Sequence, residues 1–369
     1  MRIGILSMQR IRNYGSFLQA YSLKKNIEAL GHDVQFVDYK IESVVNKANV
    51  RKGNKSIIDM LNFVRRRFYK TRKEKLFLMK KEFKKRYDTE FFDMLGLTHE
   101  RNYTPELDTL VIGSDEVFNC LQTNADVGYS KQLFGADNNA KKLITYAASF
   151  GNTTLVRLNE HSMTGEIAEM LCKFDAFSVR DKNSEAMIRE LTGKETLVHL
   201  DPVFIYDYPE ANEINISLKD YMIVYAYTNR IKENEAKKIK EFAKKHNKKI
   251  VSIGEYQDFC DEYISATPFE LLAYIKNADY VVTDTFHGTV FSIKFNKRFA
   301  TIIRQSTNGS YGNFEKLSYL LAKFNLCHRQ VENVENLENI LLTPVDFAEV
   351  NQIIANEKER AIDYLKENI

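Results

Sequence analysis

The chain has 369 residues, of which 44% are hydrophobic and 12% aromatic, and its formal net charge is +3. This length and composition exclude a disordered chain and predict two globular domains, each with a core of its own. Because 53 basic residues nearly balance 50 acidic ones, the total charge indicates no general affinity for nucleic acid.

The cysteines and the first residues indicate a cytoplasmic protein. The four cysteines show neither a CxxC pair nor a metal-ligand spacing, which favours a reducing compartment and a role as core fillers. They are Cys120, Cys172, Cys260 and Cys327. Residues 1–6 lead straight into an apolar strand, without the cationic region or cleavage site of a signal peptide. No apolar run reaches the roughly 18 residues of a membrane span. We expect neither a metal ion nor a cofactor.

The first half of the chain alternates strands and helices. The predicted elements are a strand at 2–7, a loop at 9–15, a helix at 17–30 and strands at 34–39, 109–112, 143–148 and 176–179. Each later strand ends in small or polar residues, as expected where parallel strands deliver their carboxyl ends to a ligand crevice. We assign residues 1–205 to an amino-terminal Rossmann-like domain.

A second series of the same kind follows Pro202. It comprises strands at 221–227, 249–253, 280–283 and 299–303 and helices at 233–246, 268–277 and 289–295. The segment 206–218 contains proline and Asn/Asp residues and is the expected linker. Residues 206–345 thus form a second α/β domain. The terminal segment 346–369 contains a helix at about 351–367, which periodicity alone assigns to neither domain.

An insertion at about 42–92 interrupts the first domain. Between Lys47 and Arg86 it holds about sixteen basic residues against three acidic ones, with apolar residues interleaved. One interpretation is a solvated helical pair whose apolar stripe packs on the first domain. Another is a surface for anionic membrane headgroups, or for the diphosphate of a lipid-linked acceptor. Nucleic acid is disfavoured because no recognised binding module accompanies the charge.

Two loops that follow strands of the first domain carry candidate ligands. The loop at 9–15 leads into a helix whose first turn presents backbone N–H groups beside Arg10 and Arg12, an arrangement that receives anions. A plain polar turn explains this loop equally well. In Gly113-Ser114-Asp115-Glu116, Asp115 is a candidate general base toward a sugar hydroxyl. The alternative is a residue that caps the following helix.

His287 and Arg180 are the other two candidates for chemistry. His287 follows a buried strand at the start of the next helix, where it can bind a phosphate or carboxylate or move a proton near neutral pH. A structural histidine is the alternative. Arg180 stands just beyond a strand and can pair bidentately with an anion. Its alternative is a salt bridge to Asp181 or Asp201.

Six segments resemble the polysaccharide pyruvyl transferase family, in the family's order and across about residues 3–303. They are NYGSFLQAYSL at 13–23, similar to the family's NYGAxLQAYAL; GSDEVFN at 113–119, similar to GSDQVWN; YAASFG at 146–151; SVRD at 178–181, similar to VRE or VRD; DP at 201–202; and TDTFHG at 283–288, similar to TDSFHG. Each match is modest, and together they are specific.

The resemblance implies a GT-B-like α/β architecture, in which two Rossmann-like domains turn parallel sheets toward a central cleft and the terminal helix packs back on the first domain. It implies transfer of a pyruvyl unit from phosphoenolpyruvate, a co-substrate, to two hydroxyls of a sugar, giving a cyclic ketal and phosphate in cell-surface polysaccharide synthesis. Arg180 and His287 are then expected at the anionic donor, with Asp115 near the reacting groups. Further expected substrate contacts are Arg12, Asn13, Tyr14, Gly15, Ser114, Asn119, Ser149, Thr283, Thr285, Gly288 and Arg304.

The chain departs from the family pattern in three places. Glu116 and Phe118 stand where Gln and Trp are common, and because the chain has no Trp, an aromatic platform for a sugar is left to Tyr or Phe. Thr285 stands where some members have an arginine. The candidates to replace that arginine are Arg12, Lys294 and Arg304.

Three alternatives to pyruvyl transfer from phosphoenolpyruvate follow. The first is a branch that uses a different donor. The second is a glycosyltransferase that uses a nucleotide sugar on the same fold. The third is a non-catalytic module that binds an anionic glycan or a membrane through the insertion.

Overall fold

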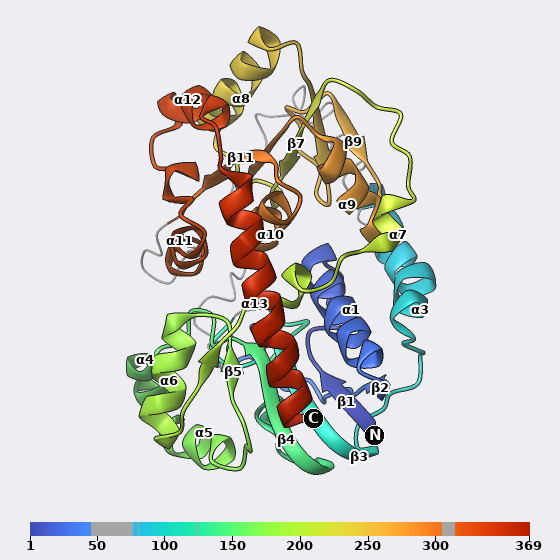
Figure 1. The fold of residues 1–369 in the computed structure, drawn as a ribbon, viewed down its shortest axis with the longest axis vertical. Coiled ribbons are helices and arrows are strands. Elements are labelled where there is room, and N and C mark those ends of the chain that lie inside the picture. Colours follow the sequence, from blue (N-terminus) through green and yellow to red (C-terminus); the bar gives the residue numbers. More distant parts are fainter. Residues whose placement is uncertain (46–76, 80, 123, 305–313) are drawn as a thin grey trace, which may run out of the picture.

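Two parallel β-sheets organise the chain, one in each half of the sequence (Figure 1). The computed structural model describes residues 1–45, 77–79, 81–122, 124–304 and 314–369. Among these residues, each sheet has six strands, and every pairing between neighbouring strands is parallel. The fold therefore consists of two Rossmann-like units.

The first sheet has the strand order β2-β1-β3-β4-β5-β6. Its strands are β1 (Arg2–Leu6), β2 (Asp33–Phe36), β3 (Glu106–Asp115), β4 (Asn139–Ala148), β5 (Ser178–Val179) and β6 (Leu197–Val198). The helices of this half are α1 (Tyr14–Ala29), the π-helical η3 (Tyr87–Phe91), α3 (Phe92–Leu95), the 3₁₀ turn η4 (Lys131–Phe134), α4 (Leu155–Glu160), α5 (Thr164–Leu171) and α6 (Lys182–Thr192). The 3₁₀ turn η5 (Pro202–Phe204) and α7 (Pro209–Asn212) lead to the second half.

The second sheet has the order β12-β11-β10-β7-β8-β9. Its strands are β7 (Tyr221–Tyr225), β8 (Lys249–Ile253), β9 (Glu262–Ile264), β10 (Tyr280–Thr283), β11 (Arg298–Ile302) and β12 (Gln330–Val331). Its helices are α8 (Glu233–Lys245), α9 (Pro268–Asn277), α10 (Phe286–Lys294), α11 (Phe314–Lys323), the 3₁₀ turns η6 (Cys327–Arg329) and η7 (Val334–Asn336), α12 (Leu337–Leu342) and α13 (Phe347–Asn368). Every residue of the central strands β7 and β10 is buried, as both faces of a parallel sheet are covered.

Helices α1 and α10, which carry candidate site residues, begin earlier than the sequence pattern predicts. The side chain of Asn13 accepts hydrogen bonds from the backbone N–H groups of Gly15 and Ser16, so α1 starts at Tyr14 and not at Phe17. Likewise Thr285 Oγ1 accepts from the Gly288 N–H, and α10 starts three residues before Thr289. The strands β6, β9 and β12 are not predicted because they are only two or three residues long.

Helix α1 lies between the two halves of the molecule and is buried on nearly all sides over its first ten residues. Its aromatic side chains reach the second half: the ring of Phe17 lies 6.1 Å from that of Phe269, and the ring of Tyr21 lies 5.0 Å from it. The polar side chains buried on this helix have partners inside the protein, as Gln19 Nε2 donates to Ser7 Oγ over 2.9 Å. The apolar core that contains α1 thus continues from one domain into the other.

The terminal helix α13 runs from the second half back to the first (Figure 1). Near its end, the buried hydroxyl of Tyr364 donates a hydrogen bond of 2.9 Å to the carbonyl of Thr145 in β4. This contact ties the end of the chain to the first sheet and places the two halves relative to one another.

Most of the basic insertion, residues 46–76 and 80, lies outside the described residues. Its described end is helical at 77–79 and 81–86 and contacts both halves. The ring of Phe83 lies 5.2 Å from that of Tyr14, and Arg86 Nη1 donates to the carbonyl of Ser265 over 2.8 Å. Among the described residues, no helix is long and apolar enough to cross a membrane.

Candidate functional site

A cavity of about 1200 Å³ lies between the two domains. Its lining comes from the carboxyl ends of both sheets, from the start of α1 and from the described end of the insertion. This is the position at which ligands bind in open parallel α/β sheets. The two Rossmann-like units with a shared cleft and a returning terminal helix constitute the expected GT-B-like arrangement.

The register of the first sheet brings Asp115 and Arg180 to one edge. Asp115 pairs with Ala148 across β3 and β4, and Ala148 pairs with Val179 across β4 and β5. Arg180 is the next residue, so its side chain and that of Asp115 emerge together. Asp115 adopts a positive φ of 79°, which is uncommon for a residue other than glycine.

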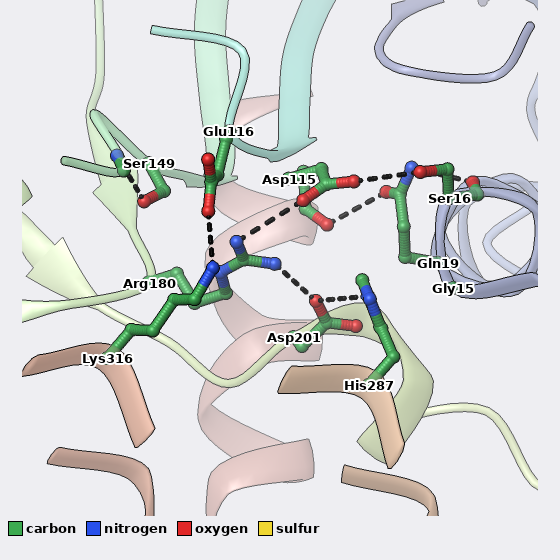
Figure 2. Close-up of polar contacts among 12 residues, drawn as sticks. Gly15, Ser16, Gln19, Asp115, Glu116, Ser149, Arg180, Asp201, His287 and Lys316 are labelled. Carbon is green, nitrogen blue, oxygen red and sulfur yellow. Dashed lines mark hydrogen bonds and ion pairs between the residues drawn. The ribbon is translucent and has the colours of Figure 1, made fainter. Parts of the chain in front are cut away.

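Two carboxylates, an arginine and a histidine form a continuous series of contacts across the cleft (Figure 2). Arg180 Nη2 lies 3.3 Å from Asp115 Oδ1, and Arg180 Nη1 donates to Asp201 Oδ2 over 2.8 Å. The same Asp201 oxygen lies 3.5 Å from Nε2 of His287, which belongs to the second domain. Asp201 therefore joins the two side chains that were expected at the anionic donor.

Electrostatic interactions within this series of contacts favour the ionised forms of Asp201 and Arg180. Burial opposes ionisation of Asp201, but the neighbouring His287 and Arg180 hold its pKa below the usual range. Burial also opposes the charge of Arg180, and the carboxylates of Asp115 and Asp201 outweigh it and raise the pKa of the guanidinium. Arg180 is further stacked on Phe286, with Cζ 4.3 Å from the ring centroid.

A second ion pair crosses the cleft beside the first. Lys316 Nζ, from α11, lies 2.8 Å from Glu116 Oε1, next in sequence to Asp115 (Figure 2). Burial would raise the pKa of Glu116, but the charges of Lys316 and Arg180 and hydrogen bonds from Lys316 and Asn119 lower it to about 2. Glu116 is therefore a carboxylate at any physiological pH, and it joins the domains.

The start of α1 supports His287 from the other side. An added Cβ at Gly15 would lie 2.1 Å from His287 Nδ1, so the imidazole lies directly against this glycine. Close by, Asn13 Nδ2 donates to the hydroxyl of Tyr227 over 3.2 Å, and both residues line the cavity. The NYG segment thus forms a surface on which residues of the second domain rest.

The predicted site residues divide into two groups. Those that line the cavity are Arg12, Asn13, Tyr14, Asp115, Asn119, Arg180, Thr285 and His287. The others lie behind its wall: Gly15, Ser114, Ser149, Thr283, Gly288 and Arg304. Hydrogen bonds occupy their polar groups, since Ser114 Oγ donates to Gln19 Oε1 and Ser149 Oγ donates to Asp181 Oδ2. Thr283 Oγ1 donates to the carbonyl of Tyr225, and Gly288 packs against Thr283 and Thr285.

The three cations considered as replacements for an arginine at Thr285 have other partners. Arg304 forms a two-pronged bond to Glu235, with distances of 2.6 and 2.7 Å, away from the cavity. Lys294 donates to the carbonyl of Phe204, and burial lowers its pKa to about 8. Arg12 does line the cavity, but it pairs with Asp88 at 2.9 Å.

The sequence analysis does not single out several residues that line the cavity. One of these is Lys316, which no sequence pattern indicates. The second domain adds Tyr227, Arg230, Glu255 and Tyr256 to the lining. Tyr227 and Arg230 lie just beyond β7, a strand end that signals a ligand position as much as the ends of β3 and β10 do. Among the described residues, no group of three or more His, Cys, Asp or Glu side chains forms a metal site.

The solved structures with a similar fold share little sequence identity with this chain. The chain is similar to the UDP-GlcNAc 2-epimerase of Methanocaldococcus jannaschii, at 10% identity over 96% of this chain and 99% of that one, with a TM-score of 0.49. It is also similar to a Neisseria meningitidis UDP-GlcNAc 2-epimerase, at 10% identity over 100% of both chains, with a TM-score of 0.47. A Streptomyces glycosyltransferase is similar at 13% identity over 99% of this chain and 98% of that one, with a TM-score of 0.43. Similarity of this degree says nothing about activity.

The family assignment comes from sequence. No curated protein matches the chain. The family model for polysaccharide pyruvyl transferase matches residues 13–306, a stretch that begins at the cap of α1 and includes Asp115, Arg180, Asp201 and His287. The same residues that meet in the cleft thus lie within the matched stretch, and the chain belongs to the polysaccharide pyruvyl transferase family, a family of transferases.

Proposed function

We propose that this protein transfers a pyruvyl unit from phosphoenolpyruvate to two hydroxyls of a sugar, forming a cyclic ketal and releasing phosphate. The observation that carries the proposal is the contact chain Asp115–Arg180–Asp201–His287, which spans the cleft of a member of this family. It sets a candidate base, a buried cation and a candidate acid side by side.

The reaction needs two proton movements and two C–O bonds. The first hydroxyl of the sugar attacks C2 of phosphoenolpyruvate while C3 gains a proton, which turns the enol carbon into a methyl group. The second hydroxyl then forms its bond to C2 as the C2–O bond to phosphate breaks. Of the two hydroxyl protons, one balances the proton gained by C3 and the other leaves with phosphate.

Each charged group has a role in this scheme. Asp115, which lines the cavity and accepts a hydrogen bond from Ser16 Oγ over 3.1 Å, takes the proton of the attacking hydroxyl. His287 delivers the proton to C3, and the ionised carboxylate of Asp201 stabilises the positive charge of its protonated ring. Arg180 holds Asp115 and Asp201 in place beside the reacting carbons.

Incubation with phosphoenolpyruvate and a panel of nucleotide-linked and lipid-linked hexoses tests the proposal. We expect phosphate release that depends on the acceptor, together with a product heavier than the acceptor by one pyruvyl ketal. Release of nucleoside diphosphate from a sugar nucleotide, with no use of phosphoenolpyruvate, would identify a glycosyltransferase instead. Absence of both reactions with every acceptor, despite glycan or vesicle binding, would favour a non-catalytic binding module.

A further inference from the structure

The cations at the centre of the site already neutralise carboxylates. Arg180 is only 5% exposed and bonds to both Asp115 and Asp201, and Lys316 pairs with Glu116. Three carboxylates therefore face two permanent cations in this cluster. Phosphoenolpyruvate brings up to three further negative charges, so its phosphate requires a cation outside the cluster.

Arg230 occupies a position that meets this requirement. It follows β7 in the second domain, lines the same cavity as His287 and has a side chain that is 29% exposed. Its Cζ lies 4.3 Å above the ring of Tyr227. A guanidinium stacked on an aromatic ring uses its face for that contact and directs its N–H groups outward in the plane, where they suit the oxygens of a phosphate.

The position of Arg230 is fixed relative to the reacting groups. Tyr227, on which it stacks, accepts a hydrogen bond from Asn13, the residue that caps α1 just before the Gly15–His287 contact. The backbone carbonyl of Arg230 accepts from Arg304 Nη2 over 2.9 Å, and the bond of Arg304 to Glu235 holds that guanidinium in turn. Arg230 Nη1 lies 3.9 Å from buried Asp284, the residue before Thr285.

The remaining cavity cations fit the phosphate less well. Arg12 pairs with Asp88. Arg157 belongs to α4 in the first domain, where its Nη1 donates to the carbonyl of Asn152 over 3.4 Å. Lys84, a further cation of the lining, is exposed on the described end of the insertion.

We propose that Arg230, stacked on Tyr227, is the ligand for the phosphate of the donor. This inference rests on the proposed function and makes it more specific: the phosphate of phosphoenolpyruvate lies toward the second domain, with the enol carbons toward His287 and Asp115. The Arg304–Glu235 pair then acts as support for the loop that carries the phosphate ligand, and Arg304 does not touch the donor.

Calorimetric titration of the full chain tests this assignment. The ligands are phosphoenolpyruvate, inorganic phosphate and pyruvate, which keeps the carboxylate and lacks the phosphate. The proteins are wild type, Arg230→Ala, Arg230→Lys and Arg157→Ala, the last of which removes the same charge from the first-domain side of the cavity. Circular dichroism confirms that each variant is folded.

We expect Arg230→Ala to weaken phosphoenolpyruvate binding by about ten- to a hundredfold, with an intermediate loss in Arg230→Lys, because an ammonium cannot reproduce the two-pronged bond. Pyruvate binding should stay the same, and inorganic phosphate should compete with phosphoenolpyruvate only while Arg230 is present. Arg157→Ala should bind phosphoenolpyruvate within about threefold of wild type.

Two failures are distinguishable. If wild type does not bind phosphoenolpyruvate, the proposed function fails and this inference fails with it. If wild type binds it and Arg230→Ala binds it equally well, or loses pyruvate and phosphoenolpyruvate to the same extent, or loses no more than Arg157→Ala, only the assignment of Arg230 is overturned.

Discussion

The imidazole of His287 rests against the backbone of Gly15, and a methyl group added to that glycine would come within 2.1 Å of Nδ1. Gly15 lies in the first turn of α1 and does not need the conformational freedom of a glycine there. The space that it leaves open is therefore occupied by the ring of the proposed acid.

Replacement of Gly15 by alanine should displace His287 and leave the helix intact. Alanine favours a helix over glycine by up to about 1 kcal/mol, so the fold should persist. We expect kcat, measured as phosphate release, to fall at least about tenfold. Gly165→Ala in α5 is the matched control, because nothing lies within 4 Å of its added Cβ. Equal activity of the two variants would contradict the functional importance of the contact.

Loss of the Asp201 charge should impair Arg180 and His287 together. In Asp201→Asn, the buried guanidinium keeps one carboxylate partner and a protonated His287 keeps none, so we expect kcat to fall by about a hundredfold or more. Loss of one member of a buried ion pair also lowers the free energy of unfolding by about 3 kcal/mol. The assays should therefore be run well below the melting temperature of the variant.

The pH profile of kcat separates a positioning role of Asp201 from mere destabilisation in Asp201→Asn. The profile should change shape, because the substitution removes a charge beside the proposed acid, whereas simple unfolding scales all rates equally. Asp207→Asn is the control: this aspartate pairs with Lys358 but is 72% exposed. A pH profile that keeps the wild-type shape would exclude a positioning role.

Replacement of His287 by glutamine, or of Arg180 by alanine, should abolish turnover. Glutamine preserves a polar side chain of similar reach but cannot deliver a proton near neutral pH, so we expect kcat to fall by about 10²–10⁴. His246→Gln provides the control, because that histidine pairs with Glu338 on α12, away from the cavity. Wild-type phosphate release from both site variants would remove the catalytic assignment.

The Glu116–Lys316 pair should make the contact between the domains sensitive to acid. The pKa of Glu116 falls from an ordinary value of 4.5 to about 2 in the fold. Between these values the unfolded chain binds a proton that the folded chain does not, so stability present above pH 4.5 is lost as the pH falls toward 2. Glu116→Gln should lower the free energy of unfolding by about 1 kcal/mol near pH 7 and by progressively less at acidic pH.

Urea unfolding of wild type and Glu116→Gln at several pH values between 7 and 3 measures this difference. Glu185→Gln removes a carboxylate from an exposed pair with Lys182 on α6 and serves as the control. If the free energies of unfolding of wild type and Glu116→Gln differ by the same amount from pH 7 to pH 3, the role of this ion pair is refuted.

Local patterns are sufficient for the bounds of three elements. The strands β8 and β10 and the helix α9 have the predicted bounds, because runs of apolar residues are properties of neighbouring residues. The starts of α1 and α10 were placed too late, since the capping bonds of Asn13 and Thr285 extend each helix beyond its apolar run. The strands β6, β9 and β12 carry no recognisable periodic signal.

The sequence by itself determined the two α/β series, the family and three side chains of the central contact chain, because strand ends and motifs are encoded locally. Only the tertiary structure decided which of them meet. Glu116 and Lys316 are 200 positions apart, and Gly15 and His287 lie in different domains. Their contacts follow from the register of parallel strands and from an apolar interface around α1 that sets one domain against the other, and both are interactions between residues distant in the chain.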